Sequence, residues 1–298
     1  MSSPIRIGTR DSELALWQAT HVQKKITSLG LESVLVPLKS EGDKNQIKPL
    51  YEMGVVGVFT KVLDTALLNH RIDIAVHSMK DVPTQLPKGL VQAAVLERES
   101  PLDLLVFKTS ELDFSKSLTI ATSSLRRKAQ WLCKYPHHQI VVLRGNVNTR
   151  LQKLKTNNWD GAIFAKAGLE RLNIVPKNSV DLPWMTPAPA QGAIMVVAKN
   201  ENPELCKLLS KINHQKTAQC VQIERNFLRT LQGGCSAPIG ALAHITNDEI
   251  HFTGNISHPN GKDTVVIEKT APIQDKALGK LYAEEILSSG GQRILQQI

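Results

Sequence analysis

The chain is poor in aromatic residues, has no long apolar run and has no closely paired cysteines. Phe, Trp and Tyr make up only 4% of its 298 residues, which argues against a surface on which single-stranded nucleic acid stacks its bases. No apolar run reaches the roughly 20 residues that a membrane-spanning helix needs. The first residues, MSSPIRI, lead almost directly into a strand pattern without a signal-peptide core. We therefore expect a cytoplasmic protein with no membrane partner.

The cysteines are too widely spaced for a zinc site or a thioredoxin-like C-x-x-C site. No other cluster of metal ligands stands out, and we predict no metal. Three of the four lie in helix-like segments, where a free cysteine usually serves as a small buried hydrophobe: Cys133, Cys206 and Cys220. Cys235 differs because it follows Gly233 and Gly234 in a loop. Glycines leave room for a bulky group beside the backbone.

The sequence does contain an excess of positive charge, with a formal net charge of +9. Two arginine-bearing segments stand out, ATSSLRR at 121–127 and RGNVNTR at 144–150. Each follows a β-branched run and precedes a helix pattern, and the start of a helix attracts anions. Arginine adds a forked donor for carboxylates or phosphates. These segments predict a ligand with several negative charges, either a nucleic acid or a small polyacid.

Short apolar strands alternate with helix patterns over the first two thirds of the chain, which predicts α/β units with parallel sheets. Strands are expected at 5–8, 33–38, 72–76, 90–96, 104–107, 118–122, 140–143, 161–165 and 192–198, and helices at 13–29, 59–68, 124–134, 147–155 and 166–172. The strand at 192–198 follows a proline-rich connection and is expected to return to the first unit. The last third has a helix at 218–231, alternating strands at 241–245, 249–256 and 264–269, and a helix at 277–288. That pattern favours an antiparallel sheet.

Polar residues follow several of the expected strands. They fall at 9–12, 77–81, 122–124 and 144–146. Ligands of open α/β sheets bind beyond the carboxyl ends of the strands. We therefore expect these loops to line one cleft between two α/β units.

Five segments together resemble the hydroxymethylbilane synthase family, also called porphobilinogen deaminase. They are IGTRDSELALWQA at 7–19, DIAVHSMKDVP at 73–83, TSSLRR at 122–127, RGNVNTR at 144–150 and GGCSAPIG at 233–240. The resemblance implies a transferase of heme and porphyrin biosynthesis. Four porphobilinogen molecules would be joined head to tail with loss of ammonia, on a primer called dipyrromethane that is bound to a cysteine. Water would then release the linear hydroxymethylbilane.

The resemblance also implies three domains and a monomer. Two doubly wound α/β lobes would resemble type II periplasmic binding proteins, and a small C-terminal α/β domain would carry a three-stranded antiparallel sheet. The expected boundaries are 1–97 plus 193–214 for the first domain, 98–192 for the second and 215–298 for the third.

The same resemblance implies roles for individual residues. Asp81 would be the catalytic carboxylate that stabilises a cationic, azafulvene-like species left when ammonia departs. Cys235 would hold the dipyrromethane cofactor by a thioether. The other cofactor-binding residues would be Lys80, Asp81, Thr122, Ser123, Ser124, Arg126, Arg127, Arg144, Gly145 and Asn146. Porphobilinogen would be bound by Arg10, Ser12, Arg144, Arg150, Arg171 and Gln191. His77 is more often a satisfied buried histidine than a base, and it is left out of catalysis.

The sequence departs from the family pattern in two places. Residues 54–57 read Gly-Val-Val-Gly, so Val56 stands where the family often has a lysine, and Leu102 stands where it often has an arginine. Each change removes one possible contact with an anion, but neither affects Asp81 or Cys235.

Two other functions share some features of the sequence. A bilobal solute-binding protein would have similar lobes but no reason for the Gly-Gly-Cys loop. A nucleic-acid-binding protein would explain the positive charge but not the scarcity of aromatics. We therefore expect porphobilinogen as the partner and no nucleic acid.

Overall fold

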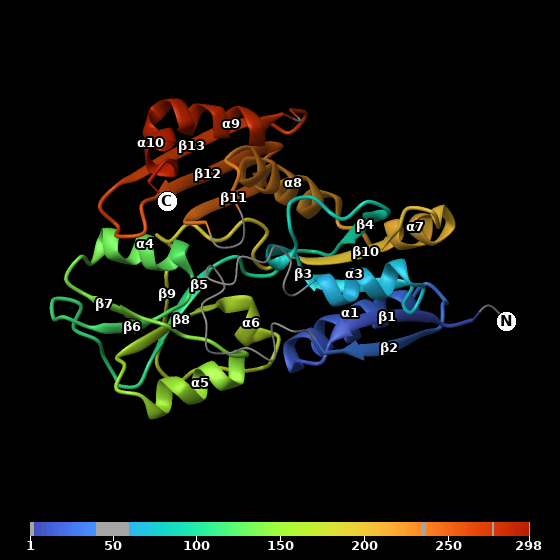
Figure 1. The fold of residues 1–298 in the computed structure, drawn as a ribbon, viewed down its shortest axis with the longest axis horizontal. Coiled ribbons are helices and arrows are strands. Elements are labelled where there is room, and N and C mark those ends of the chain that lie inside the picture. Colours follow the sequence, from blue (N-terminus) through green and yellow to red (C-terminus); the bar gives the residue numbers. More distant parts are fainter. Residues whose placement is uncertain (1–2, 40–59, 234–236, 276, 298) are drawn as a thin grey trace.

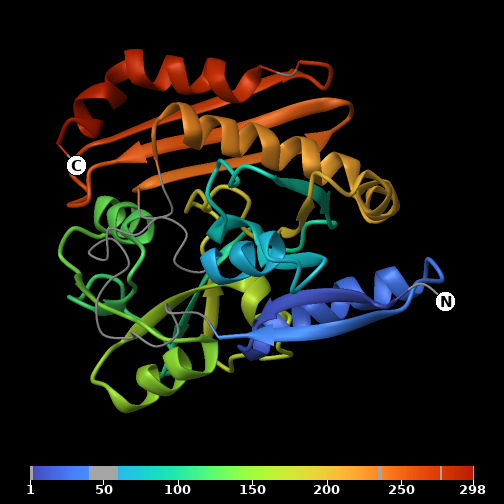
Figure 2. The same cartoon turned by 45° about the vertical axis from the view of Figure 1, so that its right-hand side comes forward.

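The computed structural model describes residues 3–39, 60–233, 237–275 and 277–297. The strands of these residues form three sheets. Figure 1 shows two α/β lobes beside each other, with the C-terminal sheet and its helices lying across them at the top. In Figure 2 the C-terminal unit again lies above the two lobes. Two α/β lobes and a small C-terminal α/β unit agree with the predicted fold class.

The first lobe contains a five-stranded sheet in the order β2-β1-β3-β10-β4. Its strands are β1 (Ile5–Arg10), β2 (Ser33–Leu38), β3 (Ile74–Ser78), β4 (Leu90–Val95) and β10 (Ile194–Lys199). Its helical elements are α1 (Glu13–Thr27), α3 (Lys61–Leu68), η2 (Met79–Asp81), α7 (Pro203–Leu209) and η3 (Ser210–Ile212). Apolar residues of β3 and β10 are buried, which is why both read as continuous apolar runs.

The second lobe repeats this design with the strand order β7-β6-β8-β5-β9. Its strands are β5 (Asp103–Phe107), β6 (Thr119–Ala121), β7 (Gln139–Val141), β8 (Gly161–Ala165) and β9 (Ser179–Asp181). Its helices are α4 (Leu125–Lys134), α5 (Val147–Thr156) and α6 (Lys166–Glu170). The sequence pattern predicts neither β9 nor α7, because such short elements contain too little of a periodic pattern.

Both five-stranded sheets are mixed, so the prediction of parallel sheets is only partly correct. β10 pairs with both β3 and β4 in the antiparallel sense, as β5 does with β8 and β9. In the first sheet, β10 returns from the second lobe and inserts between β3 and β4 against their direction. In the second sheet, β5 arrives from the first lobe and lies between β8 and β9 against theirs. This return also confirms that the strand after the proline-rich connection belongs to the first sheet.

The chain passes between the two lobes twice, and the two passages run side by side. Leu96 donates a backbone hydrogen bond to Ile194 (3.0 Å), and Glu99 donates one to Gly192 (3.2 Å). Gly192 has a φ of +87°, and a Cβ atom there would lie 2.6 Å from the carbonyl oxygen of Glu99. Only glycine allows this close approach without strain. The two passages therefore form a short paired ribbon between the lobes.

The C-terminal unit packs an antiparallel sheet against helices, as predicted. Its strands are β11 (Ile239–Thr246), β12 (Glu249–Ser257) and β13 (Thr264–Pro272), and its helices are α8 (Gln215–Thr230), α9 (Leu278–Ile286), η4 (Leu287–Gly291) and α10 (Gln292–Leu295). Phe227, Phe252 and Tyr282 pack together in its core. Val221, also on α8, is buried in the core of the first lobe instead. Helix α8 therefore joins the C-terminal unit to the first lobe.

Candidate functional site

In three of the polar segments that follow strands, a side chain caps the start of the next helix. Ser12 accepts a hydrogen bond from the backbone of Ala15 (3.4 Å), and Ser124 accepts one from Arg127 (3.4 Å). Asn146 caps α5 in the same way, accepting from Thr149 (2.8 Å). Serine and asparagine are favoured at this position because they satisfy a free backbone N–H. Three predicted binding residues thus also have local structural roles.

Ser123 joins the two arginine-bearing loops. Its hydroxyl donates to the carbonyl of Leu143 (2.8 Å) and accepts from the backbone N–H of the same residue (3.0 Å). Thr122 accepts a hydrogen bond from the backbone of Ser124 (3.2 Å). The loops after β6 and β7 therefore form one connected surface.

Arg150 shows that the loops of both lobes converge. Burial and the neighbouring charges of Arg127 and Arg144 lower the pKa of its guanidinium to about 10. Arg10, at the end of β1, lowers this pKa further, while the carboxylate of Asp81 opposes the shift. Asp81 is half-buried at the end of η2, directly after β3. Predicted residues from four separate loops therefore share one electrostatic environment.

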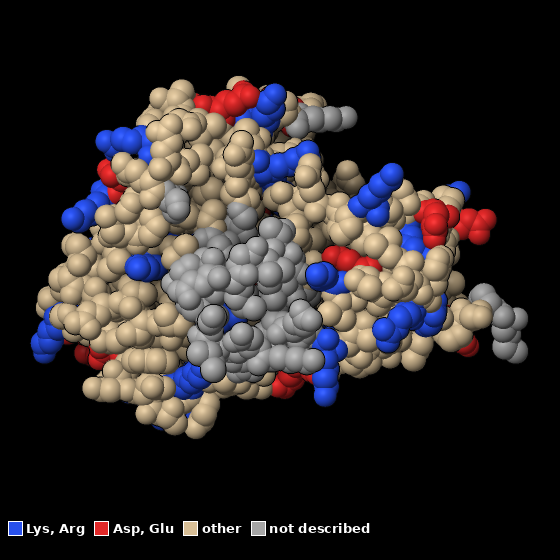
Figure 3. Space-filling model, viewed as in Figure 1, with Lys and Arg blue, Asp and Glu red and all other residues tan. Residues whose placement is uncertain are grey.

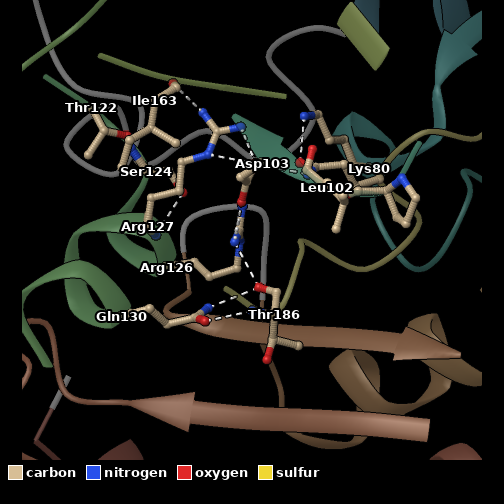
Figure 4. A network of polar contacts seen from close by, with 12 residues as sticks. Lys80, Leu102, Asp103, Thr122, Ser124, Arg126, Arg127, Gln130, Ile163 and Thr186 are labelled. Carbon is tan, nitrogen blue, oxygen red and sulfur yellow. Dashed lines mark hydrogen bonds and ion pairs between the residues drawn. The ribbon is translucent and has the colours of Figure 1, made fainter. Parts of the chain in front are cut away.

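Asp103 is the centre of the charged network in Figure 4. Its fully buried carboxylate forms an ion pair with Nη1 of Arg126 (2.8 Å) and accepts hydrogen bonds from Nη2 (2.7 Å) and Nε (3.1 Å) of Arg127. Burial alone would raise the pKa of Asp103, but the two guanidinium groups outweigh it and hold that pKa far below the ordinary value. Asp103 therefore stays ionised and fixes both arginines.

Gln191 connects this network to the first lobe. Its Nε2 donates to Oδ1 of Asp103 (2.9 Å) and to the carbonyl of Pro101 (2.7 Å). Its Oε1 accepts from Nζ of Lys80 (3.0 Å). Burial and the charge of Arg127 lower the pKa of Lys80 to about 8, against the opposing effect of Asp81. The site thus has a surplus of positive charge that an anionic ligand would relieve.

Arg127 and Arg171 also bind backbone carbonyl groups of the protein. Arg127 donates through Nη1 to the carbonyl of Ile163 (2.9 Å). Arg171 pairs with Glu99 (2.6 Å) and donates to the carbonyl of Gly192 (2.7 Å). Arg171 therefore lies at the paired passages between the lobes. From the sequence, this residue is predicted to contact the substrate. The structural role of Arg171 is evident, and its binding role stays a prediction.

Among the predicted binding arginines, Arg144 has a buried hydrogen-bond donor that is available to a ligand. It is only 5% exposed, and its Nε has no hydrogen-bond partner among the described residues. In the same part of the chain, the buried Nε of Arg126 has none either. A buried donor without a partner costs free energy, and a carboxylate is the acceptor that best matches a guanidinium. The donor set therefore fits a ligand that carries several carboxylates.

Gly145 and Arg150 shape the loop next to that anchor. Gly145 has a φ of +115°, a conformation that glycine adopts at no steric cost. Its carbonyl accepts a hydrogen bond from Nε of Arg150 (2.7 Å). The loop between Arg144 and Asn146 therefore depends on the same arginine that was predicted to bind substrate.

Some predicted features fall outside the described residues. Cys235 and the loop at 54–57, with Val56, belong to this group. Helix α8 ends at Thr230, and Gly233, whose backbone donates to the carbonyl of Leu228 (3.0 Å), is the last described residue before Cys235. Leu102 is described, and its carbonyl accepts from the backbone of Lys166 (3.0 Å).

His77 is buried, and burial together with the charge of Arg10 lowers its pKa to about 4. It is therefore neutral near pH 7.

Among the described residues, no group of three or more His, Cys, Asp or Glu side chains could hold a metal ion. Within the same part of the chain, no helix has the length and apolar character needed to cross a bilayer.

On the face drawn in Figure 3, Lys and Arg side chains are scattered over all parts of the molecule. No continuous basic stripe joins the described residues of this face, although such a stripe is the usual footprint of a nucleic-acid-binding protein. A hollow of about 560 Å³ lies elsewhere, lined by residues that include Lys88, Arg225 and Arg229.

Sequence reasoning missed Asp103 and the ion pair of Arg98 with Glu224. Nη1 of Arg98 lies 2.6 Å from Oε1 of Glu224, which is fully buried. Asp103 could have been identified from its position at the start of an apolar strand. An aspartate that is buried at such a position needs a positively charged or hydrogen-bonding partner. The sequence gives no such signal for the partner of Arg98.

Two protein-family models match the chain. Residues 5–207 match "Porphobilinogen deaminase, dipyromethane cofactor binding domain", and residues 218–288 match "Porphobilinogen deaminase, C-terminal domain". A curated relative from Geotalea uraniireducens, named porphobilinogen deaminase, is 40% identical over 300 residues, which cover 99% of this chain and 94% of the relative. Another of the same name from Syntrophomonas wolfei is 42% identical over 298 residues, covering 98% and 97%.

Solved structures with similar folds include solute-binding proteins. The L-cystine solute receptor of Neisseria gonorrhoeae is 13% identical, with a TM-score of 0.42, and covers 78% of this chain and 94% of the receptor. A periplasmic substrate-binding protein from Coxiella burnetii is 14% identical, with a TM-score of 0.44, covering 70% and 91%. Scores this low support no argument about function.

Proposed function

Because this chain belongs to the porphobilinogen deaminase family, we propose that Asp81 is its catalytic carboxylate and that Cys235 carries the dipyrromethane cofactor. The enzyme is a transferase of tetrapyrrole synthesis. It joins four porphobilinogen molecules head to tail, loses one ammonia at each addition, and releases hydroxymethylbilane with water. The observation that best supports the proposed site is the chain of contacts from Lys80 through Gln191 to Asp103 and its arginines, which joins the residue before Asp81 to the second lobe.

The cationic residues would bind the acidic side chains of the substrate and the cofactor. Each porphobilinogen carries an acetate and a propionate, so a growing chain brings many carboxylates into the site. The unpartnered Nε of Arg144 and the nearby charge of Arg150 would bind them, and each charge-assisted hydrogen bond contributes about 1.5–3 kcal/mol. When bound, the cofactor supplies the pyrrole to which the first substrate is joined. Arg126 and Arg127, fixed by Asp103, would orient its carboxylates.

Asp81 would act on the reacting centre itself. Loss of ammonia leaves a positive charge on the substrate, and a fixed carboxylate stabilises such a charge far better in a partly dry site than in water. The same carboxylate can hold or pass a proton at a pyrrole nitrogen. Lys80, bonded to Gln191, would keep a balancing positive charge beside it. Arg10, Ser12, Arg171 and Gln191 complete the proposed substrate contacts, and Thr122, Ser123, Ser124, Gly145 and Asn146 complete those of the cofactor.

The domain boundaries are proposed from the same premise. Residues 1–97 with 193–214 would form the first domain, 98–192 the second and 215–298 the third. The separate sheets and the two paired passages between the lobes support this division. We further propose a cytoplasmic monomer that binds no nucleic acid.

The cofactor attachment is tested by intact-mass measurement of the purified protein. We expect an added mass equal to two pyrrole units in the parent protein and none in Cys235→Ser. Cys133→Ser is the matched control, because Cys133 is an exposed free cysteine, and it should keep the adduct. A parent protein at its bare sequence mass, after expression with porphobilinogen available, would overturn the assignment.

The role of Asp81 is tested by Asp81→Asn. This variant should fold and keep its adduct but lose at least about a hundredfold in kcat, the scale of a lost general acid–base group. Asp113→Asn, at an exposed site in the second lobe, is the control and should turn over normally. Near-normal turnover of Asp81→Asn would remove Asp81 from the proposed role.

A further inference from the structure

Arg225 directs its guanidinium at the turn that carries Asp81. It lies on α8 and is only 7% exposed. Its Nη1 donates to the carbonyls of Val82 (2.9 Å) and Met79 (3.3 Å), and its Nη2 donates to the carbonyl of Pro83 (2.6 Å). These three carbonyls lie just before and just after Lys80 and Asp81 in the chain. The turn is therefore held from both sides by one side chain.

The turn has little backbone support of its own. The backbone of Met79 donates to the carbonyl of Ala193 (3.0 Å), and that of Val82 donates to Met79 (3.1 Å). Pro83 has no N–H to donate. A guanidinium presents several donors in a planar, fixed arrangement, so it can define the relative positions of three carbonyl groups.

The neighbouring residue on α8 anchors the helix itself. Glu224 is fully buried and accepts from Arg98 (2.6 and 3.1 Å), from the backbone of Ala190 (2.6 Å) and from the backbone of Ala243 (2.7 Å). Its partners belong to the passages between the lobes and to the C-terminal sheet. Helix α8 is thus a fixed support from which Arg225 reaches the turn.

We propose that Arg225 is a positioning residue, which holds the Met79–Pro83 turn so that the carboxylate of Asp81 stays at the reacting centre. This inference rests on the proposed catalytic role of Asp81. A displacement of about 1 Å in a catalytic group can cost on the order of a hundredfold in rate, so losing the clamp affects turnover more than substrate affinity. Arg225 would act through the turn, because its guanidinium donates to the backbone carbonyls of Met79, Val82 and Pro83.

The test is a double-mutant cycle on the adduct-bearing enzyme, with turnover expressed per loaded site. Arg225→Met keeps the length of the side chain but removes its donors. It should lower kcat by about 10- to 100-fold while KM changes by less than about threefold. Added to Asp81→Asn, it should cost at most about twofold more, because residues that act through one group are not additive. Arg229→Met, one turn along α8 and exposed, should leave kcat within about twofold of the parent.

Each other outcome is decisive. If Arg225→Met lowers the amount of folded protein but leaves kcat per loaded site unchanged, Arg225 is only structural and the inference fails. If it slows Asp81→Asn as much as it slows the parent, the inference fails while Asp81 keeps its role. Near-normal turnover of Asp81→Asn alone would instead reject the proposed catalytic role of Asp81, on which this inference rests. If Arg225→Met does not fold, Arg225→Lys replaces it in the same cycle, with an intermediate kcat expected and the same additivity criterion.

Discussion

Replacing Asp103 by asparagine should destabilise the second lobe severely. The carboxylate is completely buried, forms an ion pair with Arg126 (2.8 Å), and accepts hydrogen bonds from Arg127 (2.7 and 3.1 Å) and Gln191 (2.9 Å). Asparagine keeps the shape but leaves two buried guanidinium groups facing each other without a counter-charge. Removing one partner of a buried ion pair costs about 3–5 kcal/mol. A domain's whole stability is only about 5–15 kcal/mol.

Urea unfolding followed by tryptophan fluorescence measures this loss. Trp131 is fully buried on α4, the helix that also carries Arg126 and Arg127, so its emission reports on this lobe. Asp113→Asn is the control, because Asp113 pairs with Lys116 at the surface (3.6 Å), where an ion pair contributes about 0–1 kcal/mol. A loss below about 1 kcal/mol for Asp103→Asn would refute the reasoning.

The pH dependence of this loss has a defined sign. Because the folded pKa of Asp103 is depressed, its ion pairs stabilise the fold above the unfolded pKa of about 3.9. That stabilisation is lost progressively as the pH falls from the unfolded pKa to the lower folded pKa. The difference between parent and variant should therefore be constant from pH 5 to 8 and shrink below about pH 4. A difference that varies strongly between pH 5 and 8 would contradict the assignment.

Three further predictions concern other charged residues. Arg144→Met should raise KM for porphobilinogen by about 10- to 100-fold, the equivalent of one charge-assisted hydrogen bond, whereas steady-state kinetics of Lys211→Met should match the parent. Because the pKa of Lys80 is lowered to about 8, folding disfavours its charged form. The stability of the cofactor-free parent relative to Lys80→Met should therefore rise between pH 8 and about 10.4, the unfolded value; a flat or falling difference in urea unfolding would refute this. Glu224→Gln should cost about 3–5 kcal/mol by the same method, because it leaves Arg98 buried without its partner, and a loss under about 1 kcal/mol would count against that pairing.

The parts of the site that depend on local chemistry could be predicted from the sequence. Ser124 and Asn146 stand where a strand gives way to a helix, and both cap that helix. The strand-end loops follow from the alternation of apolar runs and helix patterns, and their convergence follows from the rule for open α/β sheets. These features need only neighbours in the chain.

The parts that depend on distant partners could not be predicted. Arg126 and Arg127 read as anchors for a ligand, yet both are held by Asp103, more than twenty residues earlier. Gln191 bonds to Asp103 across 88 positions, and nothing in its own surroundings reveals that link. The mixed direction of the sheets likewise depends on where β10 and β5 insert. Those positions depend on the packing of the whole chain and cannot be seen in the local sequence.

The paired passages between the lobes limit how the molecule can move. Two chain segments paired in this way, joined where Glu99 donates to Gly192, would bend more readily across the plane of their pairing than they would stretch or slide lengthwise. Opening would therefore resemble a door on a single axis, with the gap widening most at the rim farthest from the ribbon. Gln191, which bonds Lys80 of one lobe and Asp103 of the other, lies beside this axis and would be displaced least by such a rotation.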